Sequence, residues 1–223
     1  MQKIFSVAID GPAGAGKSTV AKAVAKALNA AYLDTGAMYR TMGLYMAEHG
    51  HRRPEAIAEA ARTPDLRVEF RDGVQRMFLD GEDVTERIRT PEAAATASKV
   101  SAVGAVRERL VDLQREIARG QSVVMDGRDI GTVVLPKATV KIFLTASPEV
   151  RARRRTRELL DKGQKADYQR ILKEIQQRDY QDTHRQVAPL KPARDALTLD
   201  TSEMDLDSVI AAIKEIVARK VAL

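Results

Sequence analysis

At 223 residues, with 44% hydrophobic and 30% charged side chains, the chain is long enough for one α/β domain with insertions and short for two independent domains. No stretch approaches the roughly 20 apolar residues that a membrane-spanning helix needs, which excludes a bilayer protein. The net charge of +6 suits a polyanionic partner, but an aromatic content of 4% leaves few rings to stack on bases, so we expect phosphorylated metabolites rather than nucleic acid.

The first 50 residues predict two strand-helix pairs. Residues 4–9 form a short apolar run that reaches a glycine-rich loop, and residues 17–28 form an alanine-rich helix. Residues 31–33 predict a second short strand, and a helix follows over about residues 37–49. Gly50 and the basic stretch 51–54, which ends at Pro54, predict a break after this helix. The first ten residues hold one lysine and no small-residue cleavage site, so we expect no secretory signal and a cytoplasmic protein.

The pattern changes between residues 66 and 84. Two strand-like runs, 66–70 and 75–79, flank Asp72-Gly73, and Asp80-Gly81 follows them. Each Asp-Gly pair is a strong hairpin signal. This segment therefore predicts a small antiparallel insert.

The second half returns to alternating helices and strands. Helical patterning over residues 91–119, with a break near Gly104, leads to a strand at 122–125. The later elements are a strand at 140–144, an arginine-rich helix over 148–163, a helix over 168–184, a strand at 197–199 and a helix over 206–218. Four or five core strands alternating with helices predict an α/β fold with a parallel central sheet flanked by helices and right-handed crossovers.

The glycine-rich loop fits the phosphate-binding pattern G-x-x-x-x-G-K-[ST] at every fixed position, between a predicted strand and a predicted helix. Its glycines let the backbone approach phosphate, amides at the helix N-terminus bind the anion, and the lysine reaches the outer phosphates. We expect ATP to bind to Gly11, Pro12, Ala13, Gly14, Ala15, Gly16, Lys17, Ser18 and Thr19.

Any metal should be a hard ion held by oxygen, because the chain has no cysteine and its three histidines lack metal-ligand spacing. The Ser18 hydroxyl is the expected Mg²⁺ ligand of the phosphate loop. Asp126 closes an apolar strand, which favours a second Mg²⁺ ligand. The alternative for Asp126 is a buried helix N-cap.

Two polar segments, 33–40 and 126–129, follow predicted strands. Ligands of open α/β sheets lie beyond the carboxyl ends of the strands, so Arg40 and Arg128 could hold one phosphate from two sides. For each arginine a solvated salt bridge is the alternative.

The helix at 148–163 is crowded with arginines: Arg151, Arg153, Arg154, Arg155 and Arg157. They form either a solvated face balanced by acidic neighbours or a mobile lid that closes over the γ-phosphate. Farther on, Arg178, Asp182 and Arg185 lie at i, i+4 and i+7 of one helical face, where they can pair internally or grip a polar ligand.

With these residues in place, the chain resembles the bacterial cytidylate kinases, a family of nucleoside monophosphate kinases, over essentially its whole length. The matching segments are residues 11–18, 33–40, the insert after residue 66, 88–90, 126–134, 140–144 and 187–190. The run Asp-Gly-Arg-Asp-Ile-Gly-Thr-Val-Val at 126–134 and the enlarged insert are specific to this family.

The resemblance implies one P-loop kinase domain over residues 1–223, which phosphorylates CMP and dCMP to CDP and dCDP with ATP and Mg²⁺. The implied parts are a core of residues 1–35, 116–150 and 168–223, an acceptor-binding insert over about 36–115, and a helical lid over about 151–167. We expect a monomer that acts on these small molecules, with no nucleic acid or membrane partner.

The resemblance also assigns roles to residues. Thr35, where the family often has serine, would bind the acceptor and its phosphate with Arg40, Arg128 and Arg185. Cytosine would be recognised by Ser98, Arg107 and Asp129, and the ribose hydroxyls by Arg178 and Asp182. The transferred phosphoryl group would be stabilised by Lys17, Arg128, Arg154 and Arg155.

Asp129 supplies a chemical reason for the choice of base. A carboxylate accepts from the exocyclic amino group of cytosine, whereas uracil presents a carbonyl there. We therefore expect CMP to be preferred over UMP.

Two other functions stay open. One is a P-loop kinase for another small molecule, such as uridylate, adenylate or shikimate. The other is a non-catalytic nucleotide-dependent protein that binds nucleic acid through its basic surface. The paired arginine loops argue against the second, because a binding switch needs no cradle for an acceptor phosphate.

Overall fold

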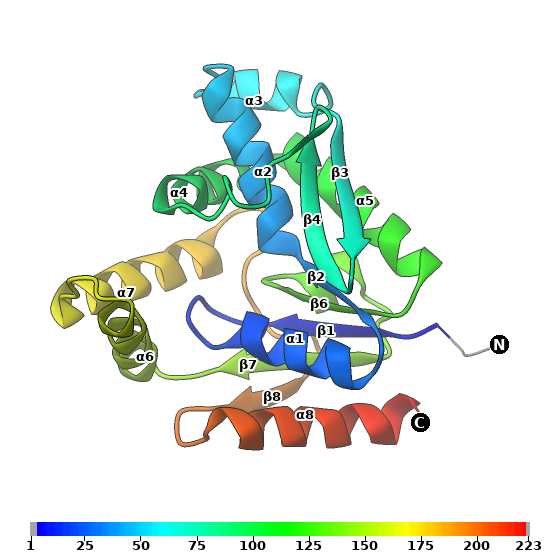
Figure 1. The fold of residues 1–223 in the computed structure, drawn as a ribbon, viewed down its shortest axis with the longest axis vertical. Helices are drawn as coiled ribbons and strands as arrows, with labels where there is room; N and C mark the ends of the chain where they lie inside the picture. The colour runs from blue at the N-terminus through cyan, green and yellow to red at the C-terminus, as the bar shows by residue number, and fades with distance from the viewer. Residues whose placement is uncertain (1–3, 222–223) are drawn as a thin grey trace. The chain divides into compact units, whose positions relative to one another are not determined.

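The computed structural model describes residues 4–221, which divide into two compact units (Figure 1). Unit 1 holds Ile4 and Ala30–Val123, and unit 2 holds Phe5–Asn29 and residues 124–221. The outermost ends of the predicted core, residues 1–3 and 222–223, lie outside the described residues. Within the described range, no helix is both long enough and apolar enough to cross a membrane.

Unit 2 is built on a parallel sheet, as predicted. Neighbouring strands follow the order β6-β1-β7-β8. Their bounds are β1 (Ser6–Asp10), β6 (Val123–Gly127), β7 (Val140–Thr145) and β8 (Leu197–Asp200). β1 pairs in parallel with β7, with Val7 opposite Val140, and β7 pairs in parallel with β8. β1, β6 and β7 are mostly apolar and mostly buried, as is usual for strands inside a parallel sheet, whereas β8 is mostly exposed.

The helices of unit 2 are α1 (Lys17–Ala27), α6 (Pro148–Asp161), α7 (Tyr168–His184) and α8 (Leu206–Val221). Ser147 caps α6 by accepting from Val150 N, and Pro148 occupies the first turn, where its missing N–H costs nothing. α6 and α7 pack on each other through a small apolar cluster around Ala152, Ile171 and Ile175. Local capping and this cluster together fix the arginine-rich helix beside α7.

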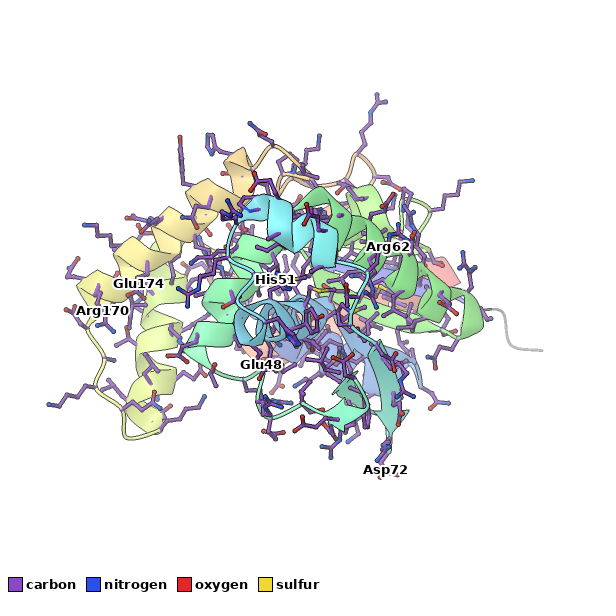
Figure 2. The ribbon with its side chains drawn as sticks, turned by 90° about the horizontal axis from the view of Figure 1, so that it is seen from above. Glu48, His51, Arg62, Asp72, Arg170 and Glu174 are labelled. Carbon is purple, nitrogen blue, oxygen red and sulfur yellow. The ribbon has the colours of Figure 1, made fainter. Side chains whose placement is uncertain are left out.

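Unit 1 contains the predicted antiparallel insert. β3 (Leu66–Arg71) and β4 (Val74–Leu79) form a hairpin, to which β5 (Glu82–Asp83) adds a short third strand. The turn residues Asp72 and Gly73 both have positive φ, 53° and 73°, which is the geometry that Asp-Gly favours. Asp72 lies at the tip of the hairpin (Figure 2). The hairpin is therefore determined by local turn chemistry and by the alternation of its strands.

The rest of unit 1 comprises β2 (Ala31–Asp34), α2 (Thr35–Glu48), α3 (Pro54–Ala60), α4 (Pro91–Val100) and α5 (Gly104–Gly120). The break predicted near Gly104 is confirmed, since α4 and α5 are separate helices. The short helix α3 was missed, because we interpreted Pro54 as part of a helix break. Proline is favoured in the first helical turn, and it begins α3.

Candidate active site

The phosphate loop turns tightly against the end of β7. Gly11 has φ 150°, and a Cβ atom at this position would lie 1.9 Å from the Leu144 carbonyl oxygen. No side chain fits there, so the packing requires a glycine at position 11. The phosphate-binding sequence pattern requires a glycine at the same position. The loop then leads into α1 at Lys17, which is the predicted strand-loop-helix order.

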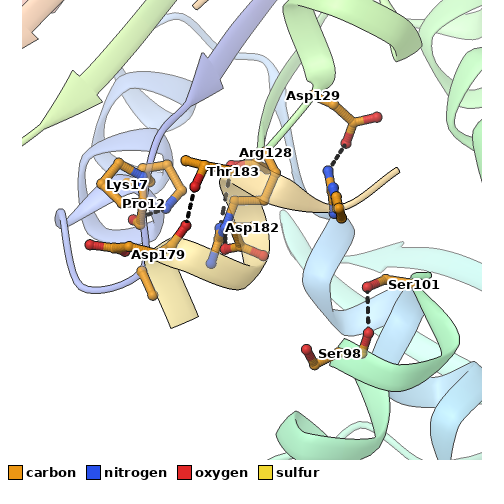
Figure 3. Close-up of polar contacts among 12 residues, drawn as sticks. Pro12, Lys17, Ser98, Ser101, Arg128, Asp129, Asp179, Asp182 and Thr183 are labelled. Atoms are coloured by element: carbon orange, nitrogen blue, oxygen red, sulfur yellow. Dashed lines mark hydrogen bonds and ion pairs between the residues drawn. The ribbon is translucent and has the colours of Figure 1, made fainter. Parts of the chain in front are cut away.

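Lys17 is buried, and its Nζ donates to the Pro12 carbonyl at 2.7 Å (Figure 3). Burial lowers the pKa of Lys17 well below its ordinary value, and the positive charge of Arg128 lowers it further. Asp126, Asp10 and Asp182 act in the opposite direction. The phosphates of a nucleotide would add negative charge and favour the ammonium form.

Ser18 and Asp126 present oxygen atoms beside this lysine. The Ser18 hydroxyl donates to Asp126 Oδ2 at 2.7 Å. Asp126 lies within β6 and not at the start of a helix, so the N-cap alternative is wrong. Two protein oxygens suit Mg²⁺, which usually keeps several waters and binds nucleotide phosphates. No group of three or more His, Cys, Asp or Glu among residues 4–221 could hold a metal alone.

Asp10, the last residue of β1, joins the phosphate loop to the segment after β6. Its carboxylate accepts from Ile130 N and Gly131 N, each at 2.7 Å. Burial raises the pKa of Asp10 to about 6, although the two amide hydrogen bonds oppose the shift. We call this arrangement the Asp10 clamp. It fixes the backbone immediately after Asp129, where a single π-helical turn (Ile130–Val134) begins.

The segment after β6 is paired with α7 and with the residue that follows it. Arg128 Nε donates to Asp182 Oδ2 at 2.8 Å, and Arg185 Nη2 lies 3.5 Å from Asp129 Oδ1 (Figure 3). Asp182 and Arg185 thus each contact this segment. Arg185 follows the last residue of α7 in extended conformation, so the prediction that it shares one helical face with Arg178 and Asp182 is wrong. Unit 2 brings together four of the predicted acceptor residues, and Arg178 lies exposed on α7.

The arginines of α6 have different surroundings. Arg154 Nη2 donates to the Thr201 carbonyl at 2.6 Å, and Arg155 forms an exposed pair with Glu158. Arg154 or Arg155 would have to leave these contacts to reach a phosphate, and their catalytic roles stay predictions.

Arg151 has no separate role in the sequence prediction, yet its side chain is only 3% exposed. Its guanidinium donates to the Ala13 carbonyl of the phosphate loop at 3.0 Å and to the Ala146 carbonyl at 2.9 Å. It also binds both carboxylate oxygens of Asp179 on α7, at 3.0 and 2.5 Å. Arg151 therefore braces the phosphate loop and α7 from one point.

Four predicted acceptor residues belong to unit 1. Thr35 is buried in the first turn of α2, and Arg40 pairs with Asp34 at 2.8 Å. Arg107 is buried on α5, with its guanidinium carbon 5.8 Å from the ring centroid of Tyr39, within cation–π range. Ser98 is exposed on α4, and its carbonyl accepts from the Ser101 hydroxyl.

The sequence prediction missed the supporting roles of Asp10 and Arg151, and that of Gln75, whose side-chain amide exchanges two hydrogen bonds with the backbone of Asp34. Asp10 carried a signal, because a carboxylate that closes an apolar strand needs a partner. Gln75 carried one too, since it shares the inward face of β4 with Met77 and Leu79. Arg151 could not be singled out from the other arginines of α6.

The family model and the curated relatives that match this chain indicate the same protein family. Residues 7–219 match the family model described as cytidylate kinase. The chain is 49% identical over 219 residues to a cytidylate kinase of Caldicellulosiruptor bescii, covering 97% of this chain and 96% of the relative. It is 49% identical over 217 residues to a cytidylate kinase of Thermosipho melanesiensis, covering 97% and 98%.

One of the solved structures with this fold serves as an example. It is an uncharacterized protein from Eubacterium ventriosum, with a TM-score of 0.54 and 16% identity. The alignment covers 97% of this chain and 99% of that one. At this identity the likeness concerns the fold alone.

Proposed function

Because this chain belongs to the cytidylate kinase family, we propose that it transfers the γ-phosphoryl group of ATP to CMP, giving ADP and CDP, and that it also accepts dCMP. The structural observation that carries the proposal is the Asp10 clamp. It joins the loop suited to a triphosphate to the segment that holds Arg128 and Asp129. This link supports the proposal, because it ties the loop that would bind ATP to the segment whose Arg128 and Asp129 would bind the acceptor.

In the proposed reaction an oxygen of the CMP phosphate attacks the γ-phosphorus, while the bond from that phosphorus to the β,γ-bridging oxygen breaks. The transition state is loose and spreads charge over the transferred oxygens, so positioning and cations matter more than a general base. Lys17, in the ammonium form that bound phosphates favour, and Arg128 would supply the positive charge. The proposal assigns no covalent intermediate.

Ser18 and Asp126 would hold Mg²⁺ together with the nucleotide phosphates. The ion, when bound, neutralises phosphate charge and orients the triphosphate. The two residues already stand 2.7 Å apart, oxygen to oxygen, with the hydroxyl directed at the carboxylate. This pre-arrangement supports the proposal, because only a small rearrangement separates a hydrogen-bonded pair from two ligands of one ion.

The acceptor contacts remain as the resemblance assigns them. Thr35, Arg40, Arg128 and Arg185 are the proposed partners of the acceptor and its phosphate. Ser98, Arg107 and Asp129 are the proposed partners of cytosine, and Arg178 and Asp182 those of the ribose. Arg154 and Arg155 are the proposed lid arginines. Each would leave its present partner, Thr201 for Arg154 and Glu158 for Arg155, to reach the transferred phosphoryl group.

A panel of acceptors tests this function. ADP release is measured with CMP, dCMP, UMP, AMP and shikimate at equal concentration, and without acceptor. We expect turnover with CMP and dCMP and much less with UMP. Equal efficiency on UMP and CMP would remove the proposed role of Asp129, and ATP binding without any acceptor-dependent turnover would favour the binding protein. The prediction of a monomer is checked by light scattering on the same sample.

A further inference from the structure

Gln75 is a polar residue at an inward position of the antiparallel insert. It is buried, with 8% of its surface exposed, on the face of β4 that it shares with Met77 and Leu79. A buried amide is costly unless both of its ends find hydrogen-bond partners. If packing were the only requirement at this position, an apolar side chain would suit it better. The hydrogen-bond partners of Gln75 therefore indicate the role of this residue.

The amide of Gln75 binds both backbone groups of a single residue, Asp34. Asp34 N donates to Gln75 Oε1 at 2.7 Å, and Gln75 Nε2 donates to the Asp34 carbonyl at 3.3 Å. Nε2 also lies 3.0 Å from the Met77 sulfur. Gln75 therefore fixes the position and orientation of the last residue of β2, as a neighbouring strand would.

The side chain of Asp34 in turn organises the first turn of α2. Its Oδ1 accepts from Ala37 N at 2.9 Å and caps the helix, and its Oδ2 accepts from Arg40 Nη2 at 2.8 Å. Gly36 makes room for this arrangement, since a Cβ there would lie 3.0 Å from Arg40 Nη1 and 3.1 Å from Asp34 Oδ1. The guanidinium of Arg40 is thus folded back over Gly36 onto a carboxylate.

We propose that Gln75 is a positioning residue for the acceptor phosphate, through which the hairpin insert holds Asp34 and thereby the guanidinium of Arg40. The inference rests on the proposed function, in which Arg40 binds that phosphate. Every contact in the chain Gln75–Asp34–Arg40 lies within unit 1. The insert therefore has a role in substrate binding that its exposed residues alone would not indicate.

Two substitutions distinguish the contributions of the donor and the acceptor of the Gln75 side-chain amide. Gln75→Leu removes both hydrogen bonds to Asp34 while keeping an inward side chain. Gln75→Glu is nearly isosteric and keeps an acceptor for Asp34 N, but it loses the donor and places a carboxylate against the Asp34 carbonyl. The matched control is Arg76→Gln on the next residue of the strand, whose side chain is 41% exposed and pairs with Asp83.

The measurement is the KM for the acceptor, the KM for ATP and kcat of each variant, with thermal melting recorded in parallel. We expect KM for CMP to rise about tenfold in both Gln75 variants, because a misdirected cation loses much of its binding. KM for ATP should stay within about twofold, as should all three parameters in the Arg76 control. A merely structural role would move KM for ATP and kcat together with KM for CMP.

A double-mutant cycle with Arg40→Met tests the route of the effect. If Gln75 acts through Arg40, adding Gln75→Leu to Arg40→Met should raise KM for the acceptor by less than about twofold. Fully multiplicative losses would overturn the proposal, as would a normal KM for CMP in both single variants. If neither Gln75 variant folds, the role is structural and the proposal is also overturned.

Failure of the proposed function would be seen separately. The acceptor in this experiment is the one that the wild-type protein turns over fastest in the panel. If that is another nucleoside monophosphate, the choice of CMP is wrong but Gln75 is still tested. If no phosphorylated acceptor is turned over, both proposals fail.

Discussion

Replacing Asp10 with asparagine should change how the stability of the protein depends on pH. Asp10 is buried, and its pKa in the folded state is about 6, above the ordinary value of 3.8. The folded state therefore holds this proton more tightly than the unfolded state does. The stabilisation from the bound proton is fully present below pH 3.8 and is lost as the pH rises through about 6.

The pKa difference sets the size of the effect. A shift of one pKa unit corresponds to about 1.4 kcal/mol, so the full change from Asp10 is about 3 kcal/mol, of which about 1 kcal/mol falls between pH 5 and pH 7. Asparagine does not titrate, and it removes this slope while also weakening one of the two amide contacts.

Urea unfolding of wild-type and Asp10→Asn protein at pH 5, 6 and 7 measures the slope. We expect the free energy of unfolding of the wild type, minus that of the variant, to fall by about 1 kcal/mol from pH 5 to pH 7 and to level off above pH 7. A difference that is independent of pH would mean that folding leaves the pKa of Asp10 unchanged, and a difference that grows with pH would mean that folding lowers it. Either result would refute the reasoning.

Three further substitutions, the first with a matched control, have distinct outcomes. Arg151→Met should cost about 3–5 kcal/mol of unfolding free energy because it leaves Asp179 without its cation. Arg170→Met, at an exposed pair on α7 (Figure 2), should cost less than about 1 kcal/mol in the same urea titrations; equal costs would deny the bracing role of Arg151. Lys17→Met should fold at least as stably as the wild type, because a buried ammonium is removed, while kcat falls about 10²–10³-fold in steady-state assays; full turnover would remove the central cation. Asp129→Asn should lower the ratio of kcat/KM for CMP to that for UMP about tenfold, because the amide can donate to the uracil carbonyl; an unchanged ratio would place base recognition elsewhere.

Much of the fold follows from local sequence signals. The parallel strands of unit 2 are apolar runs, and the hairpin of unit 1 is marked by Asp72-Gly73, so patterns a few residues long predict both. The helix α3 was missed because Pro54 has two opposite meanings, helix breaker and first-turn residue. The π-helical turn after Asp129 was missed because nothing in the sequence marks it. The first two backbone amides of this turn, Ile130 N and Gly131 N, donate to Asp10, which lies far away in the sequence.

The site was predicted unevenly for the same reason. The phosphate loop is a contiguous motif that the sequence marks directly. In the structure Lys17 donates to the Pro12 carbonyl and Ser18 donates to Asp126, while their roles with ATP and Mg²⁺ stay predictions. The supporting contacts join residues far apart in the chain, such as Gln75 with Asp34. The alternation of side chains along a strand predicts that such a polar side chain points inward. Its hydrogen-bond partner cannot be predicted in this way, because it depends on how whole helices and strands pack together. A sequence alone therefore gives the reacting groups more readily than the residues that position them.

The central claim is that the chain moves one phosphoryl group from ATP to CMP. Separation of the products by anion exchange, with purified protein, Mg²⁺, ATP and CMP, tests it most directly. The account predicts ADP and CDP in equal amounts, with ADP formation dependent on CMP. ADP released without CDP, or at the same rate in the absence of CMP, would contradict it.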